Sequence, residues 1–423
     1  MSMLVINGGR PLAGAVAISG AKNSVLPILA ATLVNAGQNI LHNCPDLRDV
    51  DSAIKILRHL GCKVTREGQT VVVDSSVIER WDVPDSLMRE MRSSVIFLGP
   101  IIARCGRARL TTPGGCELGP RPIDLHLDAL RRLGVRVEER GGEILCESGK
   151  MEGRDVILSF PSVGATENAM LAATACTGVT RIINAAREPE ICDLQEFLRK
   201  TGANITGAGG SEIAVVGGNT RRDTEHRIMP DRIETATYLC AAAACGGDIT
   251  LRECEPEHVG TVTSVLSEGG CEISVAGRSI RLRAERPLRA LPPVRTMPYP
   301  GFPTDAQAQM MAAACTARGT TIFLENIFEN RYRHVGELMR MGARIKVSGR
   351  VAVVDGGAPL HGAEVQATDL RGGAALVIAA LAAEGQSRIG EIHHIDRGYQ
   401  AIETVLSGLG ADIRRQETKK LQE

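Results

Sequence analysis

Six segments of the chain share one pattern of hydrophobic and polar positions. In each, an apolar stretch with helical spacing ends at a glycine, a small residue follows, and an alternating stretch comes next. The glycine stands where a helix end needs a left-handed residue, and the alternation is that of a half-buried strand. The pattern predicts that a helix ends, a glycine caps it and a strand begins at six junctions. They lie at residues 60–64, 133–137, 201–205, 269–273, 341–345 and 409–413.

The first copy illustrates the predicted helix. Ala53, Ile56, Leu57 and Leu60 share one face, and Asp51 is placed to cap the start. The glycines recur roughly every 70 residues, so each copy is a small α/β assembly rather than one turn of a solenoid. A chain of 423 residues favours two domains, hence three copies in each. The polar, glycine-rich stretch 217–223 is where the pattern places their division.

Composition narrows the class of protein. Hydrophobic residues make up 43% and aromatic residues only 3%, which predicts a globular protein with aliphatic cores. Lys plus Arg equals Asp plus Glu at 49 each, so no net field attracts nucleic acid. An anionic small substrate would therefore need a local arginine cluster.

The cysteines and the start of the sequence indicate a compartment. The 12 cysteines are scattered singly, with neither metal-ligand spacing nor a disulfide framework. The first residues do not show the basic region followed by an apolar region that is typical of an export signal. No apolar run reaches the length needed to span a membrane. We therefore expect a cytoplasmic protein with no metal, no cofactor, no membrane contact and no nucleic-acid partner; its oligomeric state is not predicted.

One cysteine has distinctive surroundings. Cys116 lies in a stretch, 111–122, that carries three glycines and three prolines and is typical of an exposed loop. Arg107, Arg109 and Arg121 are close in sequence and would favour its thiolate. The other eleven cysteines are expected to be inert and buried.

Charged residues elsewhere are weaker candidates on pattern alone. Lys22 and Asn23 lie at a predicted helix start, where backbone N–H groups attract anions. Further charges stand in loop-like surroundings, and each is individually typical of a surface charge or a structural ion pair. They are Arg92, Asp231, Arg232, Asp305, Arg331, Arg371 and Arg397.

Taken together, these segments resemble the UDP-N-acetylglucosamine enolpyruvyl transferases. The matching motifs occur in family order at residues 19–23, 113–116, 121–126, 162–166, 185–190, 230–234, 302–305, 328–331, 367–371 and 394–399. The resemblance implies an α/β fold, a two-domain inside-out α/β barrel built from six repeated α/β units, three per domain. Residues 22–229 would form the first domain, which carries the Cys116 loop, and residues 1–21 would join 230–423 in the second.

The same resemblance assigns roles to individual residues. Lys22, Arg121 and Arg397 would hold the phosphate of phosphoenolpyruvate, Arg331 and Arg371 would face its carboxylate, and Asn23 would also lie at this substrate. Arginine suits both groups because its planar fork donates two hydrogen bonds at once. The positions that match nucleotide-sugar contacts are Asn23, Arg92, Arg121, Pro122, Ile123, Asp124, Leu125, Ser162, Val163, Gly164, Asp305 and Ile327.

The implied reaction needs a base and an acid. Asp305 matches the family's residue near the sugar 3-hydroxyl and is the candidate base; Cys116 is the candidate proton donor and can add to phosphoenolpyruvate and to the epoxide fosfomycin. Lys22 and Arg397 complete the candidate catalytic set. Two positions depart from some family members, which carry lysine where this chain has Phe160 and Arg48.

Three alternatives stay open. The sister enzyme that acts on shikimate 3-phosphate shares the implied fold, although the Gly-Gly-Cys loop and residues 121–125 argue against it. A non-catalytic paralogue would bind nucleotide sugar and regulate a partner. A third possibility is an α/β protein that binds another dianion.

Overall fold

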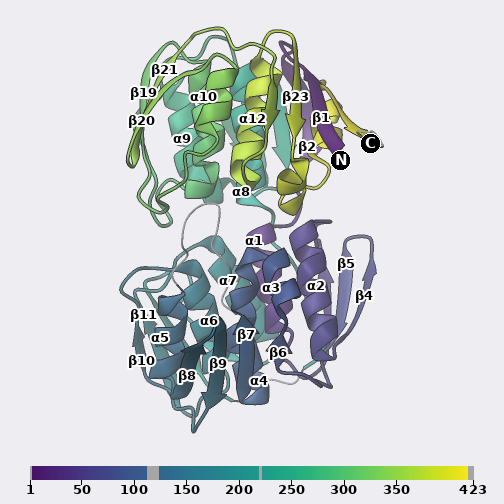
Figure 1. The fold of residues 1–423 in the computed structure, drawn as a ribbon, viewed down its shortest axis with the longest axis vertical. Coiled ribbons are helices and arrows are strands. Elements are labelled where there is room, and N and C mark those ends of the chain that lie inside the picture. The colour runs from purple at the N-terminus through teal and green to yellow at the C-terminus, as the bar shows by residue number, and fades with distance from the viewer. Residues whose placement is uncertain (1, 112–122, 219–221, 418–423) are drawn as a thin grey trace. The chain divides into compact units, whose positions relative to one another are not determined.

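The computed structural model describes residues 2–111, 123–218 and 222–417 of the chain. This part divides into two compact units, each with its own hydrophobic core (Figure 1). The N-terminal unit runs from Gly20 to Met229, and the C-terminal unit combines the residues up to Ser19 with those from Pro230 onward. The chain thus leaves the C-terminal unit at Ser19 and returns to it at Pro230.

One strand-helix-strand-helix-hairpin arrangement recurs in both units. The first strand lies parallel to the second, and the hairpin's last strand pairs antiparallel with the second. Each copy forms a four-stranded sheet, and six such sheets occur in the described residues.

The N-terminal unit holds three of the sheets. In strand order they are β14 (Thr224–Arg227), β3 (Gln38–His42), β5 (Thr70–Asp74), β4 (Lys63–Glu67); β6 (Asp82–Val83), β7 (Arg107–Thr111), β9 (Glu143–Ser148), β8 (Val135–Arg140); and β10 (Asp155–Ile157), β11 (Val179–Ile183), β13 (Glu212–Val216), β12 (Asn204–Thr206). The helices are α1 (Lys22–Ala31), α2 (Arg48–Leu60), α3 (Asp85–Glu90), α4 (Leu98–Cys105), α5 (Asp124–Arg132), α6 (Val163–Ala173) and α7 (Pro189–Lys200), with a 3-10 helix at Arg92–Phe97.

The C-terminal unit holds the other three sheets. They are β16 (Glu272–Ala276), β17 (Ser279–Ala284), β15 (Gly247–Arg252), β2 (Leu12–Ala17); β18 (Val294–Arg295), β19 (Gly319–Leu324), β21 (Val351–Gly356), β20 (Arg344–Ser348); and β22 (Glu364–Gln366), β23 (Gln386–Gly390), β1 (Ser2–Asn7), β24 (Asp412–Glu417). The helices are α8 (Arg232–Cys245), α9 (Gly260–Glu268), α10 (Gln307–Cys315), α11 (Val335–Arg340), α12 (Leu370–Ala382) and α13 (Ile402–Gly408), with 3-10 helices at Pro256–Val259, Thr304–Ala306 and Ile392–Arg397.

Distant segments of the chain complete three of the sheets. β1 pairs with both β23 and β24, so that Ile6 lies opposite Ser387 on one side and Ile413 on the other. β2 runs parallel to β15, and β14 runs parallel to β3. The two strands β1 and β2 therefore belong to sheets whose other strands lie more than two hundred residues later in the chain.

The predicted glycine caps are confirmed at all six positions. Gly61, Gly134, Gly202, Gly270, Gly342 and Gly410 have φ angles between 92° and 110°. Each follows a helix (α2, α5, α7, α9, α11 or α13) and precedes a strand. In five copies that strand opens a hairpin, whereas β24, after Gly410, pairs with β1. A side chain at such an angle is strained, so glycine allows the helix to end and the strand to begin after only two or three intervening residues.

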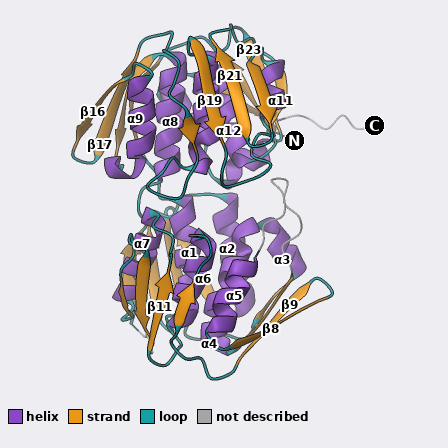
Figure 2. Cartoon of the chain, turned by 90° about the vertical axis from the view of Figure 1, so that its left-hand side faces the viewer, coloured by secondary structure: helices purple, strands orange, loops and turns teal. Residues whose placement is uncertain are grey.

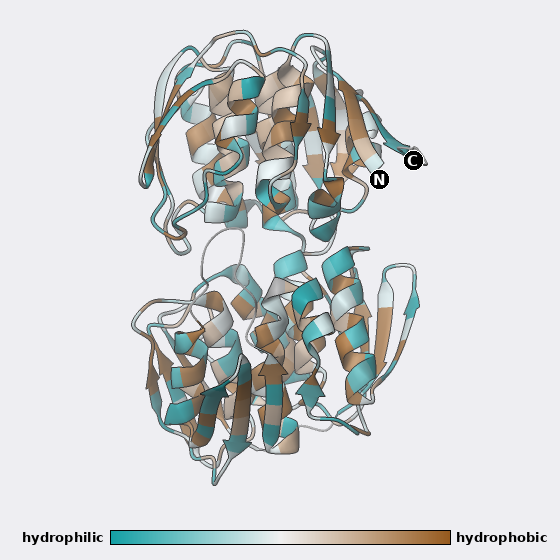
Figure 3. Ribbon diagram, in the orientation of Figure 1, coloured by the Kyte–Doolittle hydropathy of each residue, from teal (hydrophilic) through white to brown (hydrophobic). Residues whose placement is uncertain are grey.

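Helices lie inside each unit, with strands toward its outside (Figure 2). Every residue of α8 and α10 is buried, and in α12 only Leu370 is not. The sequence of α12 is correspondingly apolar and rich in alanine (Figure 3). The expected aliphatic cores are confirmed, because Leu, Ile, Val, Ala and Met supply most of both core clusters.

Two expectations about local structure are wrong. Asp51 does not cap α2: the helix begins after Leu47, and Asp51 instead pairs with Arg66 at 3.2 Å. The stretch 217–223 does not divide the units, because β14 follows it and still pairs with β3 of the N-terminal unit. Polarity marked an exposed connection there, whereas strand pairing decides where the unit ends.

None of the helices in the described ranges combines the length and the apolar composition that a membrane span requires.

Candidate active site

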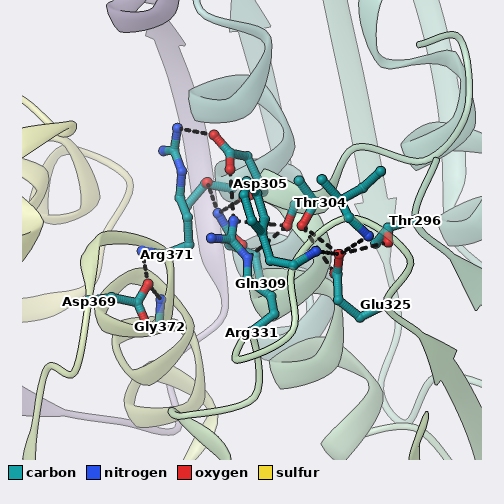
Figure 4. A network of polar contacts seen from close by, with 12 residues as sticks. Thr296, Thr304, Asp305, Gln309, Glu325, Arg331, Asp369, Arg371 and Gly372 are labelled. Atoms are coloured by element: carbon teal, nitrogen blue, oxygen red, sulfur yellow. Dashed lines mark hydrogen bonds and ion pairs between the residues drawn. The ribbon is translucent and has the colours of Figure 1, made fainter. Parts of the chain in front are cut away.

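In the C-terminal unit, one carboxylate joins two arginines that the sequence singled out separately. Arg331 Nη2 donates to Asp305 Oδ1 at 2.7 Å, and Arg371 Nη2 donates to Asp305 Oδ2 at 2.9 Å (Figure 4). Both arginine side chains are buried, whereas that of Asp305 is 27% exposed. The three residues form a cationic cluster with one partly exposed acidic member.

The backbone around Asp305 fixes Arg331. Thr304 and Asp305 lie in the 3-10 helix Thr304–Ala306, and the Thr304 carbonyl accepts from Arg331 Nε at 3.3 Å and Nη2 at 3.0 Å. The Arg331 guanidinium also lies 5.5 Å from the ring centre of Phe328. These contacts hold the planar donor fork in one orientation, which suits recognition of a carboxylate or phosphate.

Arg371 is fixed by the start of α12. Asp369 caps this helix by accepting from the backbone amides of Arg371 and Gly372. The Arg371 side chain reaches Asp305 and donates to the hydroxyl of Tyr399 at 3.3 Å. Burial works against its charge, yet the Asp305 carboxylate and nearby Tyr399 raise the Arg371 pKa above the ordinary arginine value. Arg371 is therefore a permanent cation at this position.

The Tyr399 hydroxyl extends the network into the core. It lies 2.8 Å from the Thr237 hydroxyl and accepts from Gln309 Nε2 at 3.0 Å. Gln309 also donates to the Asp305 carbonyl at 2.8 Å. The cluster thus joins α8, α10, α12 and the turn at Asp305.

Sequence reasoning missed Glu325, which organises the neighbouring turn. Its buried carboxylate accepts from the Thr296 and Thr304 hydroxyls and from the amides of Ile327 and Phe328, at 2.9–3.1 Å. It therefore fixes both Thr304, beside Asp305, and the candidate nucleotide-sugar residue Ile327. The sequence did contain a signal for this residue, because Glu325 directly follows the apolar strand β19. A glutamate at such a position is buried, and a buried glutamate needs hydrogen-bond partners.

In the N-terminal unit, Lys22 begins α1 as expected and is buried rather than solvated. Its Nζ lies 2.7 Å from Asp49 Oδ2, and the Asp49 side chain is only 2% exposed. Ser24, in the same turn, donates to Asp193. Asn23, between them, is half-buried.

Two nucleotide-sugar candidate stretches in this unit meet through one histidine. Ser162 caps α6 by accepting from the Ala165 amide at 3.4 Å, and Val163 and Gly164 form its first turn. A Cβ on Gly164 would lie 2.8 Å from the His126 ring, so glycine is required for this approach. His126 lies in α5 with Asp124 and Leu125 and just after Ile123, and it contacts Asn168 of α6 at 2.7 Å. Residues 123–125 and 162–164 thus lie at adjoining helix starts.

The remaining candidates are more dispersed. Arg397 ends the 3-10 helix Ile392–Arg397 and is half-buried. Asp231 caps α8 through the amides of Ile233 and Glu234, and Arg232 lies over the Tyr299 ring. Arg92 belongs to the 3-10 helix Arg92–Phe97. Cys116, Arg121 and Pro122 lie outside the described residues.

Two of the arginines near Cys116 in sequence, Arg107 and Arg109, contact an aromatic ring. Arg107 lies 4.6 Å and Arg109 lies 5.9 Å from the ring centre of Trp81.

The eleven described cysteines are all free, and burial raises the pKa of each, for example to about 12 for Cys44 and Cys315. Nine of them are buried, as expected, while Cys105 and Cys192 are partly exposed. Within the described ranges, no group of three or more His, Cys, Asp or Glu is arranged to hold a metal ion.

Known proteins are similar to the whole chain. A family model described as EPSP synthase (3-phosphoshikimate 1-carboxyvinyltransferase) matches residues 6–406. UDP-N-acetylglucosamine 1-carboxyvinyltransferase 2 of Caldanaerobacter subterraneus subsp. tengcongensis is 51% identical over 98% of this chain and 100% of its own length. UDP-N-acetylglucosamine 1-carboxyvinyltransferase 1 of Symbiobacterium thermophilum is 49% identical over 97% and 94%.

Solved structures of enolpyruvyl transferases are also similar to this chain. The enolpyruvyl transferase NikO from Streptomyces tendae matches with a TM-score of 0.88 at 28% identity, covering 99% of both chains. An EPSP synthase from Acinetobacter baumannii, at 17% identity and a TM-score of 0.74, covers 99% of this chain and 100% of its own and shares the fold.

Proposed function

Because the chain belongs to the UDP-N-acetylglucosamine 1-carboxyvinyltransferases, within the enolpyruvyl transferase family, we propose that it transfers the enolpyruvyl group of phosphoenolpyruvate to the 3-hydroxyl of UDP-N-acetylglucosamine. Phosphate is released, and the product commits the nucleotide sugar to peptidoglycan. The reaction takes place in the cytoplasm and uses no metal or cofactor. The single observation that carries the proposal is end-to-end identity near 50% to relatives of this name.

The Asp305 cluster supports a specific role for each member. The carboxylate of phosphoenolpyruvate replaces Asp305 as acceptor from Arg331 and Arg371, whose buried forks already bind one carboxylate. Asp305, the partly exposed member, then accepts the proton of the sugar 3-hydroxyl. When the substrate carboxylate takes the place of Asp305 at the two arginines, the same step therefore binds the substrate and frees Asp305 to act as the base.

The chemistry proceeds by addition and elimination. The sugar oxygen bonds to C2 of phosphoenolpyruvate while C3 takes a proton from the Cys116 thiol. Loss of phosphate and of a C3 proton then restores the double bond. Lys22, Arg121 and Arg397 bind the phosphate, and the nucleotide sugar contacts Asn23, Arg92, residues 121–125 and 162–164, and Ile327. Cys116 is also the site of attack on fosfomycin.

We extend the proposal to the architecture. Residues 22–229 form one enolpyruvyl transferase domain, and residues 1–21 with 230–423 form the other. Each is an inside-out α/β barrel with three repeats, which the buried inner helices α8, α10 and α12 support.

Phosphate release tests the function. With phosphoenolpyruvate present, we expect release to require UDP-N-acetylglucosamine and to persist in a chelator. Equal turnover with shikimate 3-phosphate would identify the sister enzyme instead. Binding of UDP-N-acetylglucosamine without any phosphate release would identify a non-catalytic paralogue.

A further inference from the structure

A groove in the N-terminal unit is lined by residues that were assigned above neither to substrate binding nor to catalysis. Its cavity volume is about 440 Å³, and it is formed by the segment from Ser76 to Trp81 together with Arg104, Cys105 and Arg107. Ligand sites typically occupy about 300–1,000 Å³, so a small molecule fits this space.

The groove is distant from the first turn of α1. Ser75, which precedes it, donates from its hydroxyl to the carbonyls of Thr32 and Asn35, at the far end of that helix. Ten helical residues separate this end from Lys22, a length of about 15 Å. Figure 1 accordingly places α4, whose last residue is Cys105, at the end of the unit away from the start of α1.

The charge in the groove is cationic and unbalanced. Arg80, Arg104 and Arg107 line it, and across the described ranges none of the three pairs with a carboxylate. Glu79 is the acidic lining residue. The nearby acids have other partners: Asp74 accepts from the Ser76 amide and hydroxyl, and Asp82 faces His59 at 3.7 Å and Arg109 at 3.8 Å.

The walls of the groove are held in place without a ligand. The amides of Glu79 and Arg80 both donate to the Leu60 carbonyl, at 2.9 and 3.2 Å. Arg104 Nη2 donates to the Ser76 carbonyl at 3.0 Å, and Arg107 lies over the half-buried Trp81 ring. A preformed site costs less ordering free energy on binding.

From these observations we propose that the groove is a second anion site, which binds a small phosphorylated molecule through Arg80, Arg104 and Arg107. Three guanidinium forks suit the several oxygens of a phosphate or diphosphate group. Val77, Ile78 and Trp81 supply apolar surface for the rest of the molecule. A concave site of this size on a chain of zero net charge fits a metabolite better than nucleic acid, which needs an extended basic surface.

The chain contains a built-in reporter, because Trp81 is its single tryptophan. Titrating the full-length protein with pyrophosphate should give a saturable change in tryptophan fluorescence that sodium chloride at equal ionic strength does not reproduce. In Arg80→Ala and Arg107→Ala the affinity should fall roughly tenfold to a hundredfold, the range for a lost hydrogen bond to a charged group. Arg140→Ala, an exposed arginine on β8 of the same sheet, is the matched control and should bind like the original protein.

A second readout does not depend on fluorescence. Pyrophosphate should slow alkylation of Cys105, which lines the groove, but not of Cys192, the other partly exposed thiol among the described residues. Mass spectrometry of peptides separates the two. No effect of pyrophosphate beyond that of chloride, or equal weakening in Arg140→Ala, overturns the proposal. Protection of Cys192 to the same degree as Cys105 overturns it as well.

Discussion

Arg331 and Asp305, 26 positions apart in the chain, form a 2.7 Å charged hydrogen bond in which the arginine is buried and the aspartate is partly exposed. Arg371 binds the other carboxylate oxygen at 2.9 Å. Under the proposed function, a substrate carboxylate would meet two oriented guanidinium groups and would displace the Asp305 carboxylate from them.

Asp305→Asn should therefore remove most activity while preserving the shape of the residue. Loss of a general base typically costs about 10²- to 10⁴-fold in rate. We expect kcat to fall in that range in a phosphate-release assay. Asp355→Asn, which changes an exposed carboxylate on β21, serves as the control and should retain full activity. Unchanged kcat in Asp305→Asn would exclude its role as base.

Arg331→Ala should weaken the binding of phosphoenolpyruvate far more than the binding of the nucleotide sugar. Losing one partner of a desolvated charged pair costs roughly 2 to 5 kcal/mol. Separate KM measurements for the two substrates check this, with the exposed Arg344→Ala of β20 as the control. Equal losses for both substrates would contradict the assignment of Arg331 to the carboxylate.

Cys116 should react with fosfomycin, and Cys116→Ser should abolish the adduct because a serine hydroxyl ionises far less readily. We expect one modification, at Cys116, by intact-protein mass spectrometry with peptide mapping. The other eleven thiols have raised pKa values, chiefly through burial, and should remain unmodified. An adduct on Cys105 with Cys116 intact would refute the prediction.

Glu234 should make stability depend on pH. It is fully buried, and burial, with Asp231 nearby, raises its pKa from 4.5 to about 7. The folded state therefore binds a proton that the unfolded state releases between these values, so stability falls as pH rises from about 4.5 to 7. The loss is on the order of 3 kcal/mol. Urea unfolding at pH 5, 6, 7 and 8 should show a flatter profile for Glu234→Gln but not for the exposed Glu268→Gln.

Two glycines near α11 should respond oppositely to alanine. Gly342 has a φ of 96°, and Gly342→Ala should destabilise the protein by about 1–2 kcal/mol, the cost of a left-handed residue with a side chain. Gly336, inside the helix, has open space around it, so Gly336→Ala should be neutral or stabilise by up to about 1 kcal/mol. Thermal unfolding compares the two variants; an unchanged or raised stability of Gly342→Ala would contradict the cap argument.

The sequence by itself determined the local features of this protein. Glycine between a helical and an alternating stretch specifies a helix end, because only glycine takes that backbone angle without strain. The six caps, the aliphatic cores and Lys22 at the start of α1 followed from such local rules. The family resemblance likewise rests on short motifs and on their order along the chain.

Tertiary structure decided what depends on residues distant in the chain. The glycine-rich stretch 217–223 marked a division, yet pairing of β14 with β3 moved the boundary to Met229. The sequence did not predict that Arg107 lies over the Trp81 ring, because these two residues come from different segments of the chain. Glu325 showed its importance only when Thr296, Thr304 and the amides of Ile327 and Phe328 converged on it. Burial and long-range hydrogen bonds set these outcomes, because a side chain's partners are chosen by the packing of whole elements.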